Sequence, residues 1–323
     1  MGDVVITLPY LQHLRRSLPP DARLDFLTRE ENDPVPRNIV LFDNVYSIGG
    51  GRNLRKVTLL ALLKLPMLWL QRYEMVIDLQ NNRYSRIITT WLRPKAWSRF
   101  DRFSPIAAGE RTRLTIEAAG LGECALNTAF RLKDEDRGMI LLRSAGWNGR
   151  DDLVVLNPAG LNATRNWPVQ NYAVFARLWL ERRPDTRFLI LGTAFIAEKA
   201  AALEAELGDH LINLVGKTTP FDAFAVLQEA DLMLSEDSGL MHMAWVSGVP
   251  TMALFGSSRS YWSRPLGEHS SIFDSSDLAC GNCMESVCRW GDNRCMTRHT
   301  PEKVLQHALA LLPRRFTVKS IIH

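Results

Sequence analysis

Short apolar segments alternate with longer amphipathic ones along almost the whole chain, and this alternation constrains the fold more than any other feature of the sequence. The apolar segments are nearly continuous, which is typical of parallel strands that helices cover on both faces. Residues 169–183 show the helical spacing expected between such strands. We therefore predict a doubly wound α/β fold. The predicted strands are residues 24–27, 39–42, 75–79, 153–156, 188–191, 211–215, 232–234 and 251–255.

The length of the chain and a break in its pattern predict two domains. The 323 residues exceed a typical domain of about 150 residues. Hydrophobic residues make up 46% of the chain, which is enough for full-sized cores and excludes wholesale disorder. The alternation stops around residues 132–152, where charged residues cluster and glycines follow. We interpret this stretch as a linker between two Rossmann-like domains, at residues 1–140 and 151–323.

The start of the chain departs from the pattern. A doubly wound domain normally opens with a buried strand and a Gly-rich turn. This sequence instead opens on Met1, Gly2 and Asp3, where a loop should already be leaving that strand. We therefore expect the first strand of the N-terminal domain to be missing from this sequence.

The charge and the apolar runs limit where the protein acts and what it binds. A net charge of +4 is compatible with an anionic substrate or a membrane surface, but it is far from the footprint of a nucleic-acid-binding protein. The longest apolar run, residues 57–70, is interrupted by Lys64 and Pro66 and is too short to span a bilayer. No signal-peptide pattern opens the chain, and the cysteines do not resemble a secreted disulfide scaffold. We therefore predict a cytoplasmic protein.

The most informative stretch is residues 234–242, which read Leu-Ser-Glu-Asp-Ser-Gly-Leu-Met-His. A predicted strand ends in Asp237, Ser238 and Gly239, and a helix follows at once. Backbone N–H groups at a helix start bind a pyrophosphate, and a glycine lets it approach closely. Asp237 is suited to accept hydrogen bonds from sugar hydroxyls. The alternative is that Asp237 or Ser238 only caps the helix.

A second stretch, residues 157–168, also follows a predicted strand and precedes a helix. Its Arg165 could neutralise a diphosphate leaving group with a planar, permanently charged guanidinium. A single arginine in a loop is more often simply solvated. Its position at the carboxyl end of a strand favours the functional interpretation, because ligands bind there in open α/β sheets.

Together these stretches resemble family 9 glycosyltransferases, the heptosyltransferases. Residues 235–242 and 248–256, Gly-Val-Pro-Thr-Met-Ala-Leu-Phe-Gly, look like the family's nucleotide-sugar motif. Residues 2–9 resemble its N-terminal catalytic loop, 76–80 a characteristic strand end, and 164–168 its basic-residue, Trp, Pro element. The likeness covers nearly the whole chain and is looser between residues 49 and 120.

The resemblance implies a GT-B fold, with the active site in a cleft between two Rossmann-like domains. Residues 1–140 would bind the acceptor, a lipid-linked core oligosaccharide of lipopolysaccharide. Residues 151–323 would bind the donor, typically ADP-heptose, and the last helix would pack back on the N-terminal domain. Asp3 would be the general base of an inverting transfer, without a cofactor or metal. The implied donor-binding residues are Thr164, Arg165, Gly192, Asp237, Ser238, Gly239, Leu240 and His242.

Three departures from the family pattern bear on the donor. Asp-Ser-Gly replaces the family's Asp-Thr-Gly, which keeps the hydroxyl, and Arg165 stands where Lys is common, which keeps the charge. After Gly192 the family often has an acidic residue facing the ribose, whereas Thr193 follows here and Glu198 comes late. The class of donor is therefore better supported than its identity.

The late cysteines form the pattern Cys280-x2-Cys283-x4-Cys288-x6-Cys295. Four thiols so close together predict a zinc site by count. The spacing lacks a second Cys-x-x-Cys, so buried or unligated thiols are the alternative.

Residues 52–72 mix basic side chains with many leucines and Trp69. This segment is either an interfacial helix on the inner face of the inner membrane or a core-facing helix with a solvated basic side.

Three other functions stay open. The chain could transfer another sugar to a different glycan, or it could be a catalytically weak homologue that only binds a nucleotide sugar. A dehydrogenase is disfavoured, because no predicted strand leads into a Gly-x-Gly-x-x-Gly turn.

Overall fold

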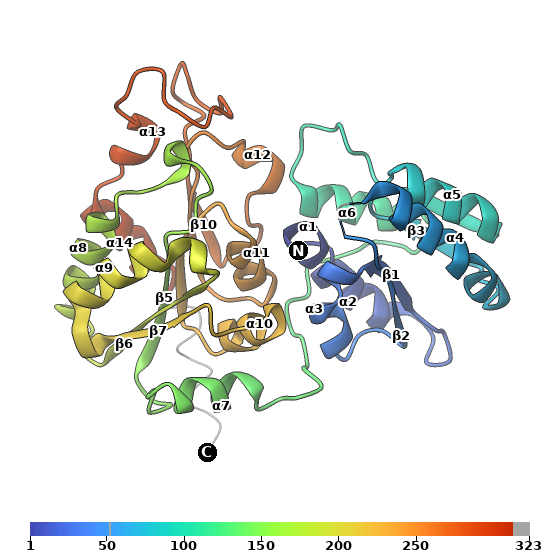
Figure 1. The fold of residues 1–323 in the computed structure, drawn as a ribbon, viewed down its shortest axis with the longest axis horizontal. Helices are drawn as coiled ribbons and strands as arrows, with labels where there is room; N and C mark the ends of the chain where they lie inside the picture. Colours follow the sequence, from blue (N-terminus) through green and yellow to red (C-terminus); the bar gives the residue numbers. More distant parts are fainter. Residues whose placement is uncertain (52, 313–323) are drawn as a thin grey trace. The chain divides into compact units, whose positions relative to one another are not determined.

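The computed structural model describes residues 1–51 and 53–312, with the side chain of residue 54 excepted. The described chain divides into two compact units between Lys133 and Asp134 (Figure 1).

The N-terminal unit contains, in its described part, two separate pairs of parallel strands. β1 (Asp25–Arg29) pairs with β2 (Asn44–Ile48), and β3 (Met75–Asp78) pairs with β4 (Ala96–Arg99). The helices connect and cover these strands. They are α1 (Gly2–Val5), α2 (Leu8–Ser17), the 3₁₀ turn η1 (Glu30–Asn32), α3 (Pro34–Asn38), α4 (Leu54–Leu70), α5 (Arg83–Leu92) and α6 (Ala108–Glu117).

α4 and α5 pack side by side in this unit (Figure 1). α4 begins after Asn53, whose side chain accepts hydrogen bonds from the N–H groups of Arg55 and Lys56. Its buried face repeats every three or four residues and packs against Ile48 and Ile88. The residues of that face are Val57, Ala61, Leu65 and Leu68.

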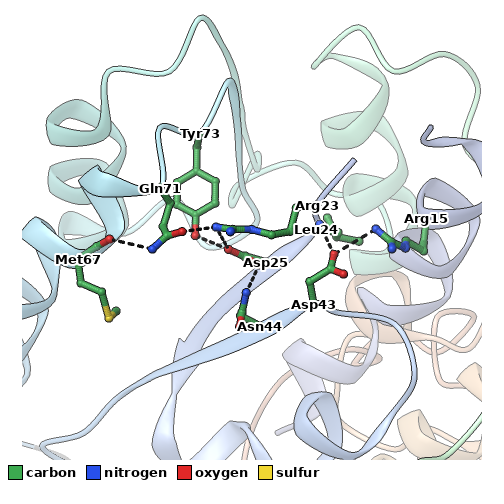
Figure 2. Close-up of polar contacts among 9 residues, drawn as sticks. All are labelled: Arg15, Arg23, Leu24, Asp25, Asp43, Asn44, Met67, Gln71 and Tyr73. Atoms are coloured by element: carbon green, nitrogen blue, oxygen red, sulfur yellow. Dashed lines mark hydrogen bonds and ion pairs between the residues drawn. The ribbon is translucent and has the colours of Figure 1, made fainter. Parts of the chain in front are cut away.

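A network of hydrogen bonds around Asp25 connects β1 to the segments that surround it (Figure 2). Asp25 accepts hydrogen bonds from Tyr73 Oη at 2.6 Å, Arg23 Nη2 at 2.9 Å and Asn44 Nδ2 at 2.9 Å. Arg23 also donates to Gln71, the residue that ends α4. Burial and the bond to Asp25 raise the pKa of Tyr73, so the phenol stays a donor. The network therefore joins β1, β2 and the end of α4.

The C-terminal unit is built on a parallel sheet, six-stranded in its described part, with the order β7-β6-β5-β8-β9-β10. The chain leaves β5 in one direction and returns to its other side with β8, which is the strand order of a Rossmann-like doubly wound domain. The predicted fold class is therefore confirmed. The strands are β5 (Asp152–Asn157), β6 (Thr186–Gly192), β7 (Leu211–Val215), β8 (Leu232–Glu236), β9 (Thr251–Leu254) and β10 (Ser270–Phe273).

Helices cover both faces of this sheet (Figure 1). On one face α8, α9 and α14 share a core that includes the fully buried Phe175 and Trp179. On the other, α10 packs against α7 and α11, and Met241 of α11 packs with Phe255. The helices and 3₁₀ turns are α7 (Arg137–Ser144), η2 (Ala163–Arg165), α8 (Val169–Leu180), η3 (Ala194–Ile196), α9 (Ala197–Leu207), η4 (Gly208–His210), α10 (Pro220–Gln228), α11 (Gly239–Val246), α12 (Ser260–Ser263), α13 (Arg294–Thr297) and α14 (Pro301–Leu311).

The structure corrects two of the sequence expectations. Residues 39–42 form no strand, apart from an antiparallel bridge between Ile39 and Leu132, although all but Val40 are buried. The predicted linker contains α7, because Leu142 is fully buried and Arg137 forms a 2.7 Å ion pair with Asp222 of α10. The last described helix, α14, packs on α8 of its own unit. Residues 313–323 lie outside the described part, so the expectation that the last helix packs back stays a prediction.

None of the helices in the described residues is both long and apolar enough to cross a bilayer.

Candidate functional site

Two loops of the C-terminal unit leave the sheet side by side at its carboxyl edge. β5 and β8 are neighbours, and Asn157 at the end of β5 aligns with Ser235 in β8. From β5 the chain continues to β6 on one side and from β8 to β9 on the other, so the edge between these two strands is the switch point of the sheet. This is the position at which open α/β sheets bind their ligands.

Arg165 and Asp237, one from each loop, meet at this edge. Arg165 Nη1 lies 3.6 Å from Asp237 Oδ2, with 17% and 14% of the two side chains exposed. Arg165 Nη2 lies 4.0 Å from Met284 Sδ, a weak acceptor. Arg165 Nε is buried and has no hydrogen-bond partner among the described residues. A buried donor without a partner is costly, so this guanidinium is suited to an anionic ligand.

The start of α11 lies in the second loop. Ser238 caps the helix, because its Oγ accepts a hydrogen bond from Met241 N at 3.2 Å. Asn157 Nδ2 donates to Ser238 Oγ at 2.7 Å and ties the cap to β5. Gly239 is exposed, and no described atom lies within 4 Å of the place a Cβ would take. Open space therefore lies beside Gly239 at this helix start, while the Ser238 hydroxyl and the Met241 N–H are used by the cap.

Gly192, at the end of β6, also lies near this helix start. A Cβ on Gly192 would be 3.8 Å from Leu240 Cδ1. Gly192 has a φ of +146°, a conformation that favours glycine. The structure therefore brings together Gly192, Leu240, Gly239, Asp237 and Arg165.

Two of the expected donor-binding side chains are engaged within the protein. The Thr164 hydroxyl bonds to Ser257 Oγ at 2.9 Å and to Glu285 O at 2.5 Å, and the side chain is buried. His242 is buried as well, and its Nδ1 accepts a hydrogen bond from Trp245 Nε1 at 3.3 Å. The contacts of Thr164 fix the loop that carries Arg165, rather than presenting a hydroxyl to a ligand.

The sequence interpretation gave no role to Glu236, although it stands inside the quoted motif. This residue is fully buried at the end of β8. Its carboxylate accepts hydrogen bonds from Gly160 N at 2.5 Å and Trp167 N at 2.6 Å. Burial raises the pKa of Glu236 to about 7, against the opposing effect of Lys199. A charged residue at the end of an otherwise apolar strand was the signal that could have revealed it.

Asp3 lies in the N-terminal unit, in the first turn of α1, and is exposed. Arg111 of α6 is near enough to feel its charge. Burial lowers the pKa of Arg111, while Asp101 and Asp3 oppose that shift. The Arg111 guanidinium stacks over the ring of Phe100 at 4.8 Å. A carboxylate and a cation therefore share this part of the N-terminal unit.

The cysteine segment borders the Arg165 loop without forming a metal site. Met284 N donates to Ser257 O at 2.8 Å, and Cys295 Sγ donates to Thr164 O at 3.7 Å. Burial raises the pKa of Cys295, which keeps that thiol protonated. Nowhere in residues 1–51 and 53–312 do three His, Cys, Asp or Glu side chains gather in a way that could hold a metal ion. The zinc interpretation therefore finds no support in the described geometry.

Comparison with known proteins identifies similar sequences. The family model of glycosyltransferase family 9 (heptosyltransferase) matches residues 67–293. Lipooligosaccharide heptosyltransferase 2 of Campylobacter jejuni subsp. jejuni serotype O:2 is 31% identical over 193 residues, which cover 58% of this chain and 57% of that protein. The chain thus spans little more than half the length of this curated relative.

Solved structures share the fold. A family 9 glycosyl transferase from Veillonella parvula superposes with a TM-score of 0.77 at 19% identity, covering 97% of this chain and 94% of that one. The E. coli ADP-heptose lps heptosyltransferase II gives a TM-score of 0.70 at 17% identity, over 97% and 96% of the two chains. The GT-B fold implied by the sequence resemblance is confirmed by these likenesses.

Proposed function

Because the chain belongs to glycosyltransferase family 9 (heptosyltransferase), we propose that it transfers a heptose from ADP-heptose to a lipopolysaccharide core acceptor. The names of the similar proteins support this donor and this class of acceptor, since they include an ADP-heptose lps heptosyltransferase and a lipooligosaccharide heptosyltransferase. In this proposal the C-terminal unit binds the donor and the N-terminal unit the acceptor.

One observation carries the proposal. The guanidinium of Arg165, with a buried Nε that lacks a partner among the described residues, lies beside the open start of α11 at the carboxyl edge of β5 and β8. A fixed cation and a helix N-terminus together favour a diphosphate. Asp237, 3.6 Å from Arg165, would orient the guanidinium or accept hydrogen bonds from sugar hydroxyls.

The proposed chemistry is a single displacement at the anomeric carbon. Asp3 takes the proton of the acceptor hydroxyl, and the oxygen attacks the anomeric carbon from the face opposite the diphosphate. The new C–O bond forms as the bond to the diphosphate breaks, so the configuration inverts and ADP leaves. Arg165 and the N–H groups at the start of α11 stabilise the negative charge that develops on ADP. These hydrogen-bonding groups are already in place before the reaction, so they need not move as the charge develops.

The test is a panel of nucleotide sugars, with and without lipid A-core acceptors, in which nucleotide release is measured. We expect release of ADP from ADP-heptose that depends on the acceptor. The variant Asp3→Asn should bind ADP normally and lose about 10²- to 10⁴-fold in turnover, which is the usual contribution of a general base. Release from another nucleotide sugar would instead support transfer of a different sugar. Binding without turnover would support a binding homologue.

The outer face of α4 supports a proposal about the membrane. This helix buries one apolar face, yet Leu63 and Trp69 on its other side are 67% and 60% exposed. Trp91 of α5 and Trp97 of β4 are also more than half exposed. The basic side chains along this stretch are Arg55, Lys56, Lys64, Arg72, Arg83, Arg86, Arg93, Lys95 and Arg99. The acidic ones are Glu74 and Asp78, of which Asp78 is buried.

An exposed apolar face with this charge suits an anionic lipid surface, because leucine and tryptophan enter the interface while lysine and arginine meet the headgroups. We propose that α4 and α5 hold the N-terminal unit against such a surface. Residue 52, which belongs to the segment singled out in the sequence, lies outside the described part.

A further inference from the structure

We propose that Glu236 is the positioning residue of the donor site: its ionised carboxylate fixes the loop that carries Arg165, and nucleotide binding weakens when this carboxylate takes up a proton. The inference rests on the proposed function only for the identity of the ligand. The hydrogen bonds that carry it lie within the described C-terminal unit.

The carboxylate holds both ends of the loop. Oε2 accepts the hydrogen bond from Gly160 N at 2.5 Å, and Oε1 accepts the one from Trp167 N at 2.6 Å. These residues lie on either side of Arg165. Each oxygen therefore serves one N–H donor, and the two donors stand at opposite ends of the segment that positions the guanidinium.

The loop backbone approaches the Glu236 carboxylate closely at Gly160. A Cβ on Gly160 would be 2.7 Å from Glu236 Oε2 and 2.5 Å from Arg165 O. The loop backbone therefore packs directly on the carboxylate, and a change in that contact is felt at Arg165.

The loop makes polar contacts with other residues besides Glu236. Lys199 Nζ, from α9, donates to Pro158 O at 2.7 Å and to Asn166 Oδ1 at 2.6 Å. Trp167 Nε1 donates to His299 O at 2.8 Å. These contacts keep the loop attached to the unit, so protonation of Glu236 would loosen the loop without detaching it.

The titratable groups that face Glu236 or its loop include three that stay neutral near neutral pH. Burial raises the pKa of Tyr172 of α8 well above its usual value, and burial also raises that of Cys295, so both stay neutral. Burial lowers the pKa of His299 to about 4, so the imidazole is neutral at higher pH. Burial raises the pKa of Glu236 itself to about 7, with Lys199 opposing.

Protonation would have a defined structural consequence. A carboxylic acid has one oxygen that carries hydrogen, and here both oxygens face an N–H donor. One of the two backbone N–H groups would then face the hydroxyl oxygen of the acid, a weaker acceptor than a carboxylate oxygen, which is costly for a buried donor. The loop would shift to relieve this, and the guanidinium of Arg165 would move with it.

The first test needs no nucleotide. The backbone amide signals of Gly160 and Trp167 are followed by ¹⁵N NMR while the pH is raised from about 5.5 to about 8.5, in the native protein and in Glu236→Gln. We expect both amides to titrate with one shared midpoint near neutral pH in the native protein, and to stay constant in the variant. Amide signals that do not titrate in the native protein would overturn the proposal.

The second test links the carboxylate to binding. Calorimetry with ADP is carried out at about pH 5.5 and about pH 8.5. The Kd of the variant is divided by that of the native protein at each pH, because the ionisation of ADP affects both Kd values equally and drops out of the ratio. We expect Glu236→Gln to bind about tenfold more weakly than the native protein at the higher pH and within about twofold of it at the lower pH. An equal ratio at both pH values would overturn the proposal.

Two further variants separate positioning from folding. Asp222→Asn removes another buried carboxylate of the same unit, which pairs with Arg137 away from this loop. It should lower stability and keep the native pH dependence of ADP binding. Glu236→Asp keeps the charge but is too short to reach both N–H donors, so its binding should be intermediate, and it replaces Glu236→Gln if that variant does not fold. If the native protein binds no ADP at either pH, the proposed function fails, and the amide titration still decides the role of Glu236.

Discussion

Arg165 is a half-buried cation whose protein partners satisfy only part of its guanidinium. Nη1 is 3.6 Å from Asp237, Nη2 meets only a methionine sulfur, and Nε has no acceptor in the described part of the chain. A guanidinium held in this way keeps a fixed orientation and retains donors for a ligand.

We predict that Arg165→Ala weakens ADP binding by at least about tenfold, because a charge-assisted contact to a diphosphate is lost. The affinity of Arg165→Lys for ADP should lie between those of the native protein and Arg165→Ala, since lysine keeps the charge but loses the planar, forked arrangement of N–H donors. Calorimetry measures both. The matched control is Arg177→Ala, which removes an exposed arginine of α8 that pairs with Glu206 of α9 and should bind ADP like the native protein. Equal binding by Arg165→Ala and the control would contradict the prediction.

Part of this site could be predicted from the sequence, but the residues that hold the Arg165 loop in place could not. Arg165, Asp237 and Gly239 could be singled out because each stands where a strand ends and a helix follows. Glu236 stands at a strand end as well, but its role was missed because it depends on burial in the folded unit and on hydrogen bonds to a loop some seventy residues away in the chain. Thr164 was expected to bind the donor, but its hydroxyl bonds to Ser257 and Glu285, from segments that only the folded chain brings close.

At the scale of elements, two glycines differ in the space around them: Gly239 at the start of α11 is open, and Gly256 in the loop after β9 is tightly packed. Gly239 has open space where a Cβ would be, as far as the described atoms extend, whereas a Cβ on Gly256 would be 2.0 Å from Thr164 O. The first glycine leaves room for a ligand, and the second lets two loops approach closely.

We predict that Gly239→Ala changes the free energy of unfolding by less than about 0.5 kcal/mol, because alanine suits a helix start without steric conflict. It should nevertheless weaken ADP binding, since the added methyl group occupies the space proposed for the diphosphate. The control Gly256→Ala should cost more than about 2 kcal/mol of stability, as an overpacked contact must shift backbone. Denaturant unfolding and calorimetry measure the two effects. Unchanged ADP binding by a folded Gly239→Ala would contradict the prediction.

The outer face of α4 gives a prediction for the element as a whole. The double variant Leu63→Ser with Trp69→Ser should remove binding to vesicles that contain phosphatidylglycerol, while stability changes little because both side chains are largely exposed. Co-sedimentation measures the binding, with phosphatidylcholine vesicles as the uncharged comparison. Ile140→Ser, an exposed apolar position on α7 of the other unit, is the control. Association of the native protein with itself in place of vesicles would instead assign this face to a second copy.

The elements differed in how well the sequence predicted them. Strands of the central sheet such as β7 and β9 are continuous apolar runs, and their positions were found within a residue or so. β2, β4 and β10 were missed, because they are half-exposed and mix polar with apolar residues. Residues 39–42 were misassigned, since a largely buried apolar run without a neighbouring strand has the same composition as a strand.

For the whole molecule, a buried carboxylate that titrates near neutral pH should affect global stability and local order in opposite senses. Folding raises the pKa of Glu236 from 4.5 to about 7, so the folded state binds more protons than the unfolded state between these values. The stability that this group contributes is present below about pH 4.5 and is lost as the pH rises through about 7.

We predict that the difference in unfolding free energy between the native protein and Glu236→Gln falls by about 2 to 3 kcal/mol from about pH 5 to about pH 8. Denaturant unfolding at the two pH values measures it. His299 acts in the opposite sense at lower pH, because burial lowers its pKa to about 4, but both proteins carry it and its effect cancels. A difference that does not change with pH would show that Glu236 keeps one charge state.

The strand order of the sheet explains why the candidate ligand-binding residues of the C-terminal unit lie together. β5 and β8 are the neighbouring strands at which the chain changes direction, and their following loops carry Arg165 and Asp237. The alternation of strands and helices predicted such a sheet, but which strands are neighbours is decided by packing and could not be determined from the sequence alone.

The central claim is that a diphosphate lies between Arg165 and the start of α11, and a crystal structure of the protein with ADP tests it most directly. We expect the diphosphate oxygens within hydrogen-bond distance of the Arg165 guanidinium and of the backbone N–H groups near Gly239. A diphosphate bound elsewhere, with Arg165 still turned to Asp237 and the start of α11 unoccupied, would contradict the account.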